Sequence, residues 1–394
     1  MAAPLPNSGR DLRFDSLRGL MLVMMTVNHL PSRLSALTDQ PLGICSSAEG
    51  FVFLSGLLAG LVYTRRLRRE GRDNLWAATR KRTTMIWRWQ AGSLVGALAA
   101  VQLVTVFFHF CSEKAPQLFY AHPWLSILLG GAMLYQPGML DILPMYCVFV
   151  AGLPIVLEQL EAGRRAWVLG ISAFLWLTVQ GLWGSNIDGA PLYPLHVGSF
   201  NLFAWQFIFY AGVVIGHRKA TSTQPLIPFR PWLFALVLAF TVYGWGVQHR
   251  GWVPPGWSDL FFGVAINKTA LGIFRLTNFG CVAYLLAVLG RQYPKVLTWR
   301  PLAFLGQHSI AVFAVQSVVG IVMLEFWWLF ETPTRNWITT GVALGALWIS
   351  ALVHERFSGK KGPSKGSGVG SGNPLDARQS PALPLTPRND IRAA

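Results

Sequence analysis

Apolar runs of about twenty residues recur along this chain, separated by polar or aromatic segments. Each run is long enough to cross a bilayer as a helix, which needs about 20 apolar residues. The pattern therefore predicts an all-α, polytopic membrane protein, a bundle of about ten transmembrane helices. We place the spans at roughly 16–31, 48–64, 85–109, 140–158, 166–183, 200–216, 232–248, 271–290, 302–324 and 337–354. Residues 123–135 are apolar but short, which indicates a re-entrant or interfacial helix.

Composition supports the same class of protein. Of the 394 residues, 53% are hydrophobic and 13% are charged, whereas soluble domains carry about 25% charged residues. Mean hydropathy is +0.42. The cysteines are dispersed and show no spacing typical of a metal site, so we predict none. They are Cys45, Cys111, Cys147 and Cys281.

The formal charge of +16 would suggest a nucleic-acid partner in a soluble protein. Here the positive-inside rule explains it better, because Lys and Arg gather on one side of the predicted topology. That side, the loop after the second span included, carries Arg65, Arg66, Arg68, Arg69, Arg72, Arg80, Lys81, Arg82, Arg88, Arg164, Arg165, Arg218, Lys219, Arg230, Arg291, Lys295 and Arg300. The other side has Arg33, Lys114, Arg250, Lys268 and Arg335, with Arg275 at or just inside a helix. Both termini are therefore predicted to be cytoplasmic, and no nucleic acid is expected as a partner.

The chain changes character at Phe357, where a segment rich in Gly, Ser, Pro and Lys begins. Such a segment lacks the apolar content that folding requires. We predict a membrane domain over residues 1–356 and a disordered cytoplasmic tail over residues 357–394.

The first apolar helix carries ionisable residues toward both ends. Residues 10–29 are R-D-L-R-F-D-S-L-R-G-L-M-L-V-M-M-T-V-N-H. Arg18 and His29 are eleven residues apart, which returns them to nearly one helix face at about 100° per residue, roughly 16 Å apart along the axis. Asp15 is placed for an i,i+3 ion pair with Arg18, and Asn28 precedes His29. The topology puts the cation at the cytoplasmic end and the imidazole toward the outer end.

The second helix returns inward and begins near a carboxylate. Glu49, Gly56 and Gly60 share one face, and the G-x-x-x-G pair lets a neighbouring helix approach closely. Since Glu49 and His29 are predicted at similar depth on adjacent helices, they can form a dyad. The carboxylate would fix the imidazole tautomer and support a general base. The alternative is that each residue merely caps a helix; the cost of ionisable groups in an apolar setting favours function for the pair.

The outer connections, at 30–47, 110–122, 184–199 and 249–270, are long and rich in Trp, Tyr, Pro, Gly, Asn and Asp. Sugar-binding surfaces combine aromatic faces with planar polar groups in this way. Membrane-interface belts also use Trp and Tyr, and both interpretations stay open.

Several segments together resemble one enzyme family. R-x-x-D-x-x-R-G, with His29 ten intervening residues after Arg18, is similar to the R-x10-H signature of acyltransferase family 3. Five further segments resemble the OpgC-type subgroup of that family. They are A-E-G-F-V-F-L-S-G-L-L-A-G-L-V-Y (48–63), D-I-L-P-M-Y (141–146), F-A-W-Q-F-I-F-Y-A-G (203–212), N-K-T-A-L-G-I-F-R (267–275) and L-G-Q-H-S-I-A-V-F (305–313). The resemblance covers about 10–320 and implies a bacterial inner-membrane enzyme. Such an enzyme moves acyl groups from cytoplasmic acyl-CoA to an extracytoplasmic carbohydrate hydroxyl, and the subgroup is named for succinylation of osmoregulated periplasmic glucans.

The resemblance carries Arg18 and His29 over directly, whereas the catalytic role of Glu49 is our inference. Acyl-CoA is expected as a co-substrate, with no tightly bound cofactor. Its phosphates suit cytoplasmic cations, although ordinary loop charge explains Arg65–Arg72 better. His308 is either a CoA-side contact or a structural residue at a helix start. The predicted acyl-CoA-binding residues are Arg10, Arg13, Arg18, Arg80, Lys81, Arg82 and His308.

Two further cations lie near the outer part of the eighth span. Lys268 and Arg275 are seven residues apart, hence on one helix face, and Asn278 lies on the same stripe as Arg275. We expect this group to bind the carboxylate of a succinyl chain or to stabilise an oxyanion. A structural pair with Asp259 or a lipid phosphate is equally favoured. Asp141 and Gln206 are predicted as buried polar support.

The sequence thus predicts an O-succinyltransferase with a central tunnel between a cytoplasmic mouth and an outer cleft. His29 would act as general base or form an acyl-His intermediate. An O-acetyltransferase of another envelope polysaccharide or lipid-linked sugar is the alternative within enzymes. A glycan transporter is the alternative from another class.

Overall fold

The computed structural model describes residues 11–108, 117–181, 198–222, 229–253, 256 and 259–358. Secondary structure in these ranges is helical, with no sheet, so the predicted all-α class is confirmed. The predicted tail lies outside the described residues from residue 359 onward.

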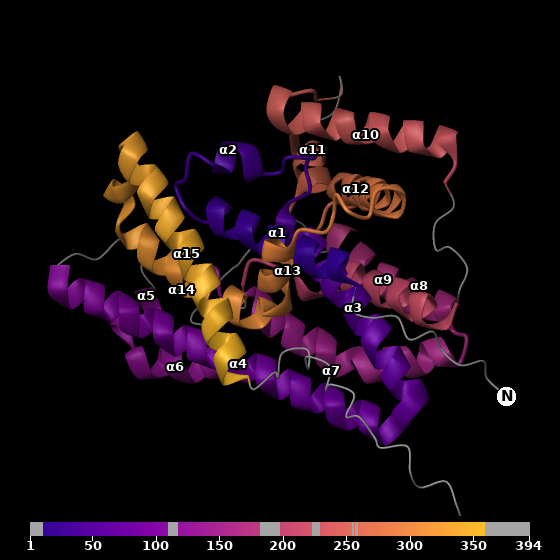
Figure 1. The fold of residues 1–394 in the computed structure, drawn as a ribbon, viewed down its shortest axis with the longest axis horizontal. Helices are drawn as coiled ribbons and strands as arrows, with labels where there is room; N and C mark the ends of the chain where they lie inside the picture. Colours follow the sequence, from indigo (N-terminus) through magenta and orange to yellow (C-terminus); the bar gives the residue numbers. More distant parts are fainter. Residues whose placement is uncertain are drawn as a thin grey trace, which may run out of the picture.

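The longer helices are α1 (Leu12–Asn28), α3 (Ser47–Glu70), α4 (Arg72–Phe108), α7 (Ile142–Glu161), α8 (Arg165–Gly181), α9 (Leu202–Thr221), α10 (Pro231–Arg250), α12 (Ile273–Gln292), α14 (Ser309–Glu325) and α15 (Pro333–Phe357). The shorter ones are α2 (Ser35–Thr38), α5 (Gln117–Ala121), α6 (Pro123–Gly131), α11 (Asp259–Ile266), α13 (Arg300–Gln307) and the 3-10 helix η2 (Trp327–Phe330). Figure 1 shows these helices as one bundle, with α10 at its margin beside α11 and α12.

Six of these helices are long and apolar enough to cross a membrane, namely α3, α4, α7, α10, α12 and α15. The bent pair α13–α14 makes a seventh if it counts as one span. This is a multi-pass membrane protein. The ten predicted spans are thus supported only in part: α1 has 17 residues and the described part of α8 has 17, fewer than the ~20 of a straight crossing. Helix α9 is long enough but is not among the apolar candidates.

The predicted ninth span, 302–324, is not one straight helix. It breaks at His308, and the two pieces meet at 87°. Close packing against α1 explains the break. A Cβ added at Gly306 would lie 1.8 Å from the backbone oxygen of Asp15, and one added at Gly19 would lie 1.9 Å from that of Leu302. The backbones of α1 and α13 therefore touch, and the chain must turn before it can continue outward.

The predicted loop between the second and third spans is also helical. α3 continues to Glu70 and α4 begins at Arg72, with Gly71 between them at a φ of +86°. A glycine adopts this backbone conformation at no steric cost. The basic residues expected in a loop thus extend both helices: α4, at 37 residues, is about 55 Å long, well beyond a 30 Å hydrocarbon core.

The tightest contact between long helices joins α3 and α9. Cβ atoms added at Gly56 and Gly60 would lie 2.0 and 2.3 Å from backbone oxygens of α9. Gly212 and Gly216 face α3 in the same way, at 2.4 and 2.0 Å. The close approach predicted for Gly56 and Gly60 is confirmed, and α9 supplies a matching G-x-x-x-G pair.

Contacts between helix ends fit an up-and-down arrangement. The end of α3, the start of α4 and the end of α9 all form ion pairs with the last turn of α7. At the opposite end, the starts of α3 and α12 form a buried ion pair. The first set lies on the predicted cytoplasmic side, so the described contacts are compatible with the predicted orientation.

Candidate active site

Helices α1 and α14 run side by side in the same direction, and their contacts define what we call the α1–α14 seam. Its first contact joins Arg18 to Ser309, whose hydroxyl accepts a hydrogen bond of 2.6 Å from the guanidinium. The guanidinium of Arg18 also lies 5.4 Å from the ring centroid of Phe51 on α3. A polar and an aromatic contact therefore hold the cation at the start of the seam.

The middle of the seam joins Thr26 to Gln316. The hydroxyl of Thr26 lies 2.9 Å from Oε1 of Gln316 and also 2.9 Å from the carbonyl oxygen of Leu22 in its own helix. Gln316 is 1% exposed. A carboxamide is thus buried between two helices, seven residues beyond the Ser309 contact.

The outer end of the seam joins His29 to Gly320. A Cβ added at Gly320 would lie 3.8 Å from the Cβ of His29 and 2.7 Å from the sulfur of Met139. Met139 has a φ of +72°, which is uncommon for a residue with a Cβ. A strained loop therefore packs beside His29.

One ring nitrogen of His29 is buried and makes no hydrogen bond to a described residue. Its Nδ1 is inaccessible to solvent and has no hydrogen-bond partner among the described residues. Lys268 lies within electrostatic range of His29 and of Asp141. The imidazole, the ammonium and the carboxylate come from three separate segments, so the fold gathers polar groups at the end of the seam that is predicted to face outward.

Glu49 pairs with Arg275 instead of His29. Its Oε1 accepts a hydrogen bond of 2.6 Å from the guanidinium, and the two side chains are 0% and 6% exposed. Its Oε2 accepts from the backbone N–H and the hydroxyl of Ser46, at 2.9 and 2.5 Å, which completes a capping box. The predicted dyad is therefore wrong in its geometry, because both carboxylate oxygens have other partners.

Glu49 and His29 do not lie at the same depth along α1. The start of α3 meets α1 near Met21, whose side chain lies where a Cβ of Gly50 would be. Met21 precedes His29 by eight residues, about 12 Å of helix. Glu49 therefore sits beside the middle of α1 and not beside its outer end.

Asn278 and Arg275 both hold backbone in place. Oδ1 of Asn278 accepts from the N–H groups of Ile44 and Cys45, at 2.9 and 3.1 Å. Nε of Arg275 donates to the carbonyl of Ile266 at 2.9 Å. These contacts favour the structural alternative for the two residues, with Glu49 as the partner in place of Asp259 or a lipid phosphate.

A family model described as OpgC protein matches residues 10–358, most of the chain. The chain belongs to the OpgC protein family. Membership implies a role in glucan succinylation and a succinyltransferase enzyme. No curated protein and no solved structure matches the chain. The resemblance carried by the sequence motifs is thereby confirmed, over a longer range than the motifs themselves span.

Several residues of the motifs shared with the OpgC family make contacts between helices. Gly19, beside Arg18, and Gly306, in L-G-Q-H, are the two points where α1 and α13 touch. In A-W-Q, Gln206 donates to the carbonyl of Ser172 and accepts from its hydroxyl, at 2.7 and 2.6 Å. Gln206 thus fastens α9 to α8, as predicted for a supporting residue.

Two other predicted supports hold loops. Nδ2 of Asn28 donates to the carbonyl of Thr38 at 3.1 Å, and its Oδ1 accepts from the Thr38 hydroxyl. Oδ2 of Asp141 accepts from the N–H of Ser199 at 2.9 Å. The predicted ion pair between Asp15 and Arg18 stays a prediction.

The predicted cytoplasmic cations are not equivalent. Arg13 donates to both carboxylate oxygens of Asp11 and to the carbonyl of Gly290. Burial raises the pKa of Asp11, but its hydrogen bonds with Arg13 and the charges of Arg13 and Lys219 outweigh that effect and hold the pKa below its ordinary value. Arg80 and Lys81 are exposed on α4, and Arg82 is half-buried. Arg10 lies outside the described residues.

His308 lies at the break between α13 and α14, as predicted for a residue at a helix start. It is buried, and its Nδ1 lies 2.9 Å from Nδ1 of His354 on α15. Phe304 and Trp89 pack against this pair of rings. The pair joins the break to the end of α15, a contact that the sequence did not reveal.

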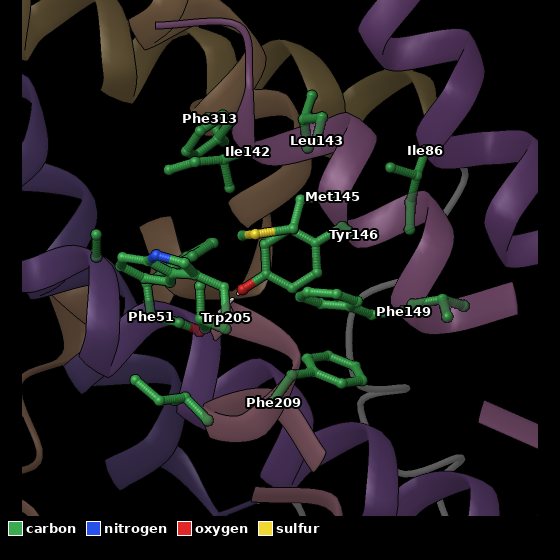
Figure 2. Close-up of a cluster of buried hydrophobic side chains, with 14 of the residues drawn as sticks. Phe51, Ile86, Ile142, Leu143, Met145, Tyr146, Phe149, Trp205, Phe209 and Phe313 are labelled. Carbon is green, nitrogen blue, oxygen red and sulfur yellow. Dashed lines mark hydrogen bonds between the residues drawn. The ribbon is translucent and has the colours of Figure 1, made fainter. Parts of the chain in front are cut away.

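Aromatic side chains fill the space between α3, α7, α9 and α14 (Figure 2). Tyr146 points its hydroxyl toward the carbonyl of Phe51, at 3.2 Å. The rings of Phe51 and Phe313 stack at 5.9 Å, and those of Phe149 and Phe209 lie 5.3 Å apart. This aromatic core packs beside the start of the seam, where Phe51 contacts Arg18.

Two cavities are described, and neither lies along the seam. One, of about 470 Å³, is lined by Leu67, Arg68, Arg72, Glu158 and Glu161 on the predicted cytoplasmic side. The other, of about 410 Å³, lies on α8. The central tunnel stays a prediction.

Gln316 is the residue of this site that our sequence reasoning missed. A signal was available, because it is an amide within a long apolar run, V-F-A-V-Q-S-V-V. Polar groups at such positions are costly and usually face the interior of the bundle. Gly212 and Gly216 were equally visible as a second G-x-x-x-G pair.

Proposed function

We propose that this protein is an inner-membrane O-acyltransferase of bacteria, which transfers the succinyl group of cytoplasmic succinyl-CoA to hydroxyls of a periplasmic glucan. Family membership supports the succinyl group and the glucan. The α1–α14 seam supports the path, because it joins a cation near one end of α1 to an imidazole at the other. Succinyl-CoA is a co-substrate that leaves as CoA, and no resident cofactor is proposed.

In this proposal the donor enters from the cytoplasm. Its phosphates would bind cations near the start of α1, such as Arg18 and the exposed Arg80 and Lys81, because guanidinium and ammonium groups pair with phosphate oxygens. The pantetheine arm would follow the seam, and the ~16 Å between Arg18 and His29 suits an extended arm. The predicted tunnel would be this path.

The observation that carries the proposal is the buried Nδ1 of His29, which has no hydrogen-bond partner among the described residues. Leaving such a group unpaired costs about 1–3 kcal/mol. Native proteins keep few of them, and each has a physical explanation such as a catalytic role, local strain or an ordered water. A hydrogen bond to a bound substrate would satisfy the imidazole and explain why the chain retains it.

The reaction needs one proton acceptor. The sugar hydroxyl oxygen attacks the thioester carbonyl carbon while its proton passes to His29, and a tetrahedral intermediate forms. The C–S bond then breaks, the C–O ester bond remains, and the proton passes from His29 to the CoA sulfur. An acyl-His intermediate, in which His29 attacks the thioester first, is the alternative.

Lys268 is the member of the predicted group best placed to bind the succinyl carboxylate. Its side chain is exposed and lies within electrostatic range of His29, whereas Arg275 and Asn278 hold backbone. The indole of Trp205 donates to the carbonyl of Lys268 at 3.1 Å, which fixes its loop. Glu49 contributes by positioning the start of α3 and not by touching His29.

The test uses purified full-length protein in proteoliposomes, with succinyl-CoA on one side and glucan on the other. We expect succinyl esters on the glucan, with CoA release that depends on both substrates. Transfer from acetyl-CoA at an equal or higher rate would favour the O-acetyltransferase alternative. Glycan flux without any requirement for acyl-CoA would favour the transporter and reject the proposed enzyme.

A further inference from the structure

The carboxamide of Gln316 is only half used by the protein. Its Oε1 lies 2.9 Å from the hydroxyl oxygen of Thr26, which lies equally close to the carbonyl oxygen of Leu22 in its own helix. Its Nε2 is inaccessible to solvent and has no partner among the described residues, and the residue is 1% exposed. A buried amide donor without an acceptor is rare in native proteins, so this one requires an explanation.

The position of Gln316 relates it directly to His29. Gln316 precedes Gly320 by four residues on α14, and Thr26 precedes His29 by three residues on α1. Since Gly320 packs against His29 and Gln316 against Thr26, the amide lies about one turn, roughly 5–6 Å, from the level of the imidazole. The amide and the imidazole therefore lie at neighbouring levels of the same helix pair.

The neighbouring polar groups do not offer the same donor. The hydroxyl of Ser317 donates to the carbonyl of Phe313 in its own helix at 3.1 Å. Arg275 is bound to Glu49 and to the carbonyl of Ile266.

We propose that Nε2 of Gln316 donates a hydrogen bond to the carbonyl oxygen of the acyl thioester. This inference rests on the proposed function. As the sugar hydroxyl adds to the carbonyl carbon, the C=O electron pair moves onto that oxygen, and it returns when the C–S bond breaks and CoA leaves. A fixed donor in a water-poor site is worth most at the moment when this charge is present. Thr26 holds the amide in place and acts as a positioning residue.

The experiment compares Gln316→Met with wild type and with the matched control Ser317→Ala, all as full-length protein in proteoliposomes. We expect Gln316→Met to lower kcat for succinyl-CoA by about 10²-fold, the usual loss for one oxyanion donor, with KM within about twofold. Ser317→Ala should keep wild-type kcat. Thr26→Val, which frees the amide to rotate, should lower kcat by about tenfold.

Thermal unfolding in detergent separates this role from a structural one. Because Nε2 has no partner among the described residues and the Thr26 hydroxyl keeps the carbonyl of Leu22 as its acceptor, Gln316→Met should unfold at the wild-type temperature or above it. Unchanged kcat in Gln316→Met would overturn the inference, and so would a variant that fails to fold, since the amide would then be structural. An inactive wild type would reject the proposed function itself, which is a distinguishable result.

Discussion

Two polar clusters are buried beside α1, and they differ in how completely their hydrogen bonds are satisfied. The first consists of Ser46, Glu49 and Arg275, where both carboxylate oxygens and two guanidinium nitrogens have partners within the protein. The second consists of His29 and Gln316, where a ring nitrogen and an amide nitrogen are buried without a partner among the described residues. A buried ion pair with complete bonding is a feature of structure. Buried donors and acceptors without a partner need a further partner, such as a bound substrate or an ordered water.

Charge alone does not identify which buried polar residues have unused hydrogen-bonding capacity. An ionisable residue within an apolar helix is a functional candidate by default, and that rule favoured Glu49 and Arg275 before the fold was known. The structure shows that each neutralises the other. The uncharged Gln316, which attracts less attention in a sequence, keeps its capacity to bind.

The largest effect is expected from His29→Ala. A general base contributes about 10²–10⁴-fold to the rate, so succinyl transfer should fall by that factor. Stability should change by at most about 1 kcal/mol, because no described residue bonds to the imidazole Nδ1. CoA release and thermal unfolding measure the two effects, and His249→Ala, which removes an exposed histidine, is the control. Full transfer by folded His29→Ala would refute both catalytic roles of His29.

Arg275→Met should produce the opposite pattern. It leaves the carboxylate of Glu49 buried and without its cation, which costs about 3–5 kcal/mol, so the yield of monodisperse protein and its unfolding temperature should fall. The double variant Glu49→Gln/Arg275→Met should recover much of this loss. Arg66→Met removes an exposed pair with Glu70 and should cost less than about 1 kcal/mol. An unfolding temperature unchanged in Arg275→Met would mean that the first cluster is not structural.

Lys268→Met tests which cation recognises the acyl chain. An exposed cation contributes modestly, so we expect KM for succinyl-CoA to rise by about tenfold, while KM for acetyl-CoA stays within about twofold because acetyl lacks the carboxylate. Steady-state CoA release with each donor provides the measurement. Equal losses for the two donors would count against the carboxylate role.

Much of the fold was predictable because apolar periodicity is a local signal. All ten predicted ranges contain a helix in the described residues, and the G-x-x-x-G pair of α3 packs as expected. The break at His308 was not predictable in this way, since L-G-Q-H-S-I-A-V-F continues an apolar run. It results from contact between the backbones of α1 and α13, two segments nearly 300 residues apart in the chain.

The site was predictable where its residues lie on one helix and unpredictable where two helices meet. The spacing of Arg18 and His29 follows from helix geometry alone. The partner of Glu49 depended on where α3 crosses α1, and sequence spacing contains no information about a crossing point. The same limit hid the contact of Thr26 with Gln316, which lies 290 residues further along the chain.

A third polar cluster, at the predicted cytoplasmic end, should give the smallest effect because it is partly exposed. There Arg68 and His217 both bond Glu161. Burial raises the pKa of Glu161, yet Arg68 and His217 hold it below its ordinary value. Burial also lowers the pKa of His217, although the nearby carboxylate of Glu161 raises it.

The unfolded chain binds a proton at His217 below about pH 6.5, whereas the folded protein keeps this imidazole neutral to a lower pH. The free energy of unfolding should therefore fall on acidification from pH 7.5 to pH 5.5. His217→Gln should reduce this fall in unfolding temperature by an amount worth at most about 1 kcal/mol; the carboxylate of Glu161 matters only below about pH 4.3. An identical fall in the variant and in wild type would show that His217 is not kept neutral by the fold.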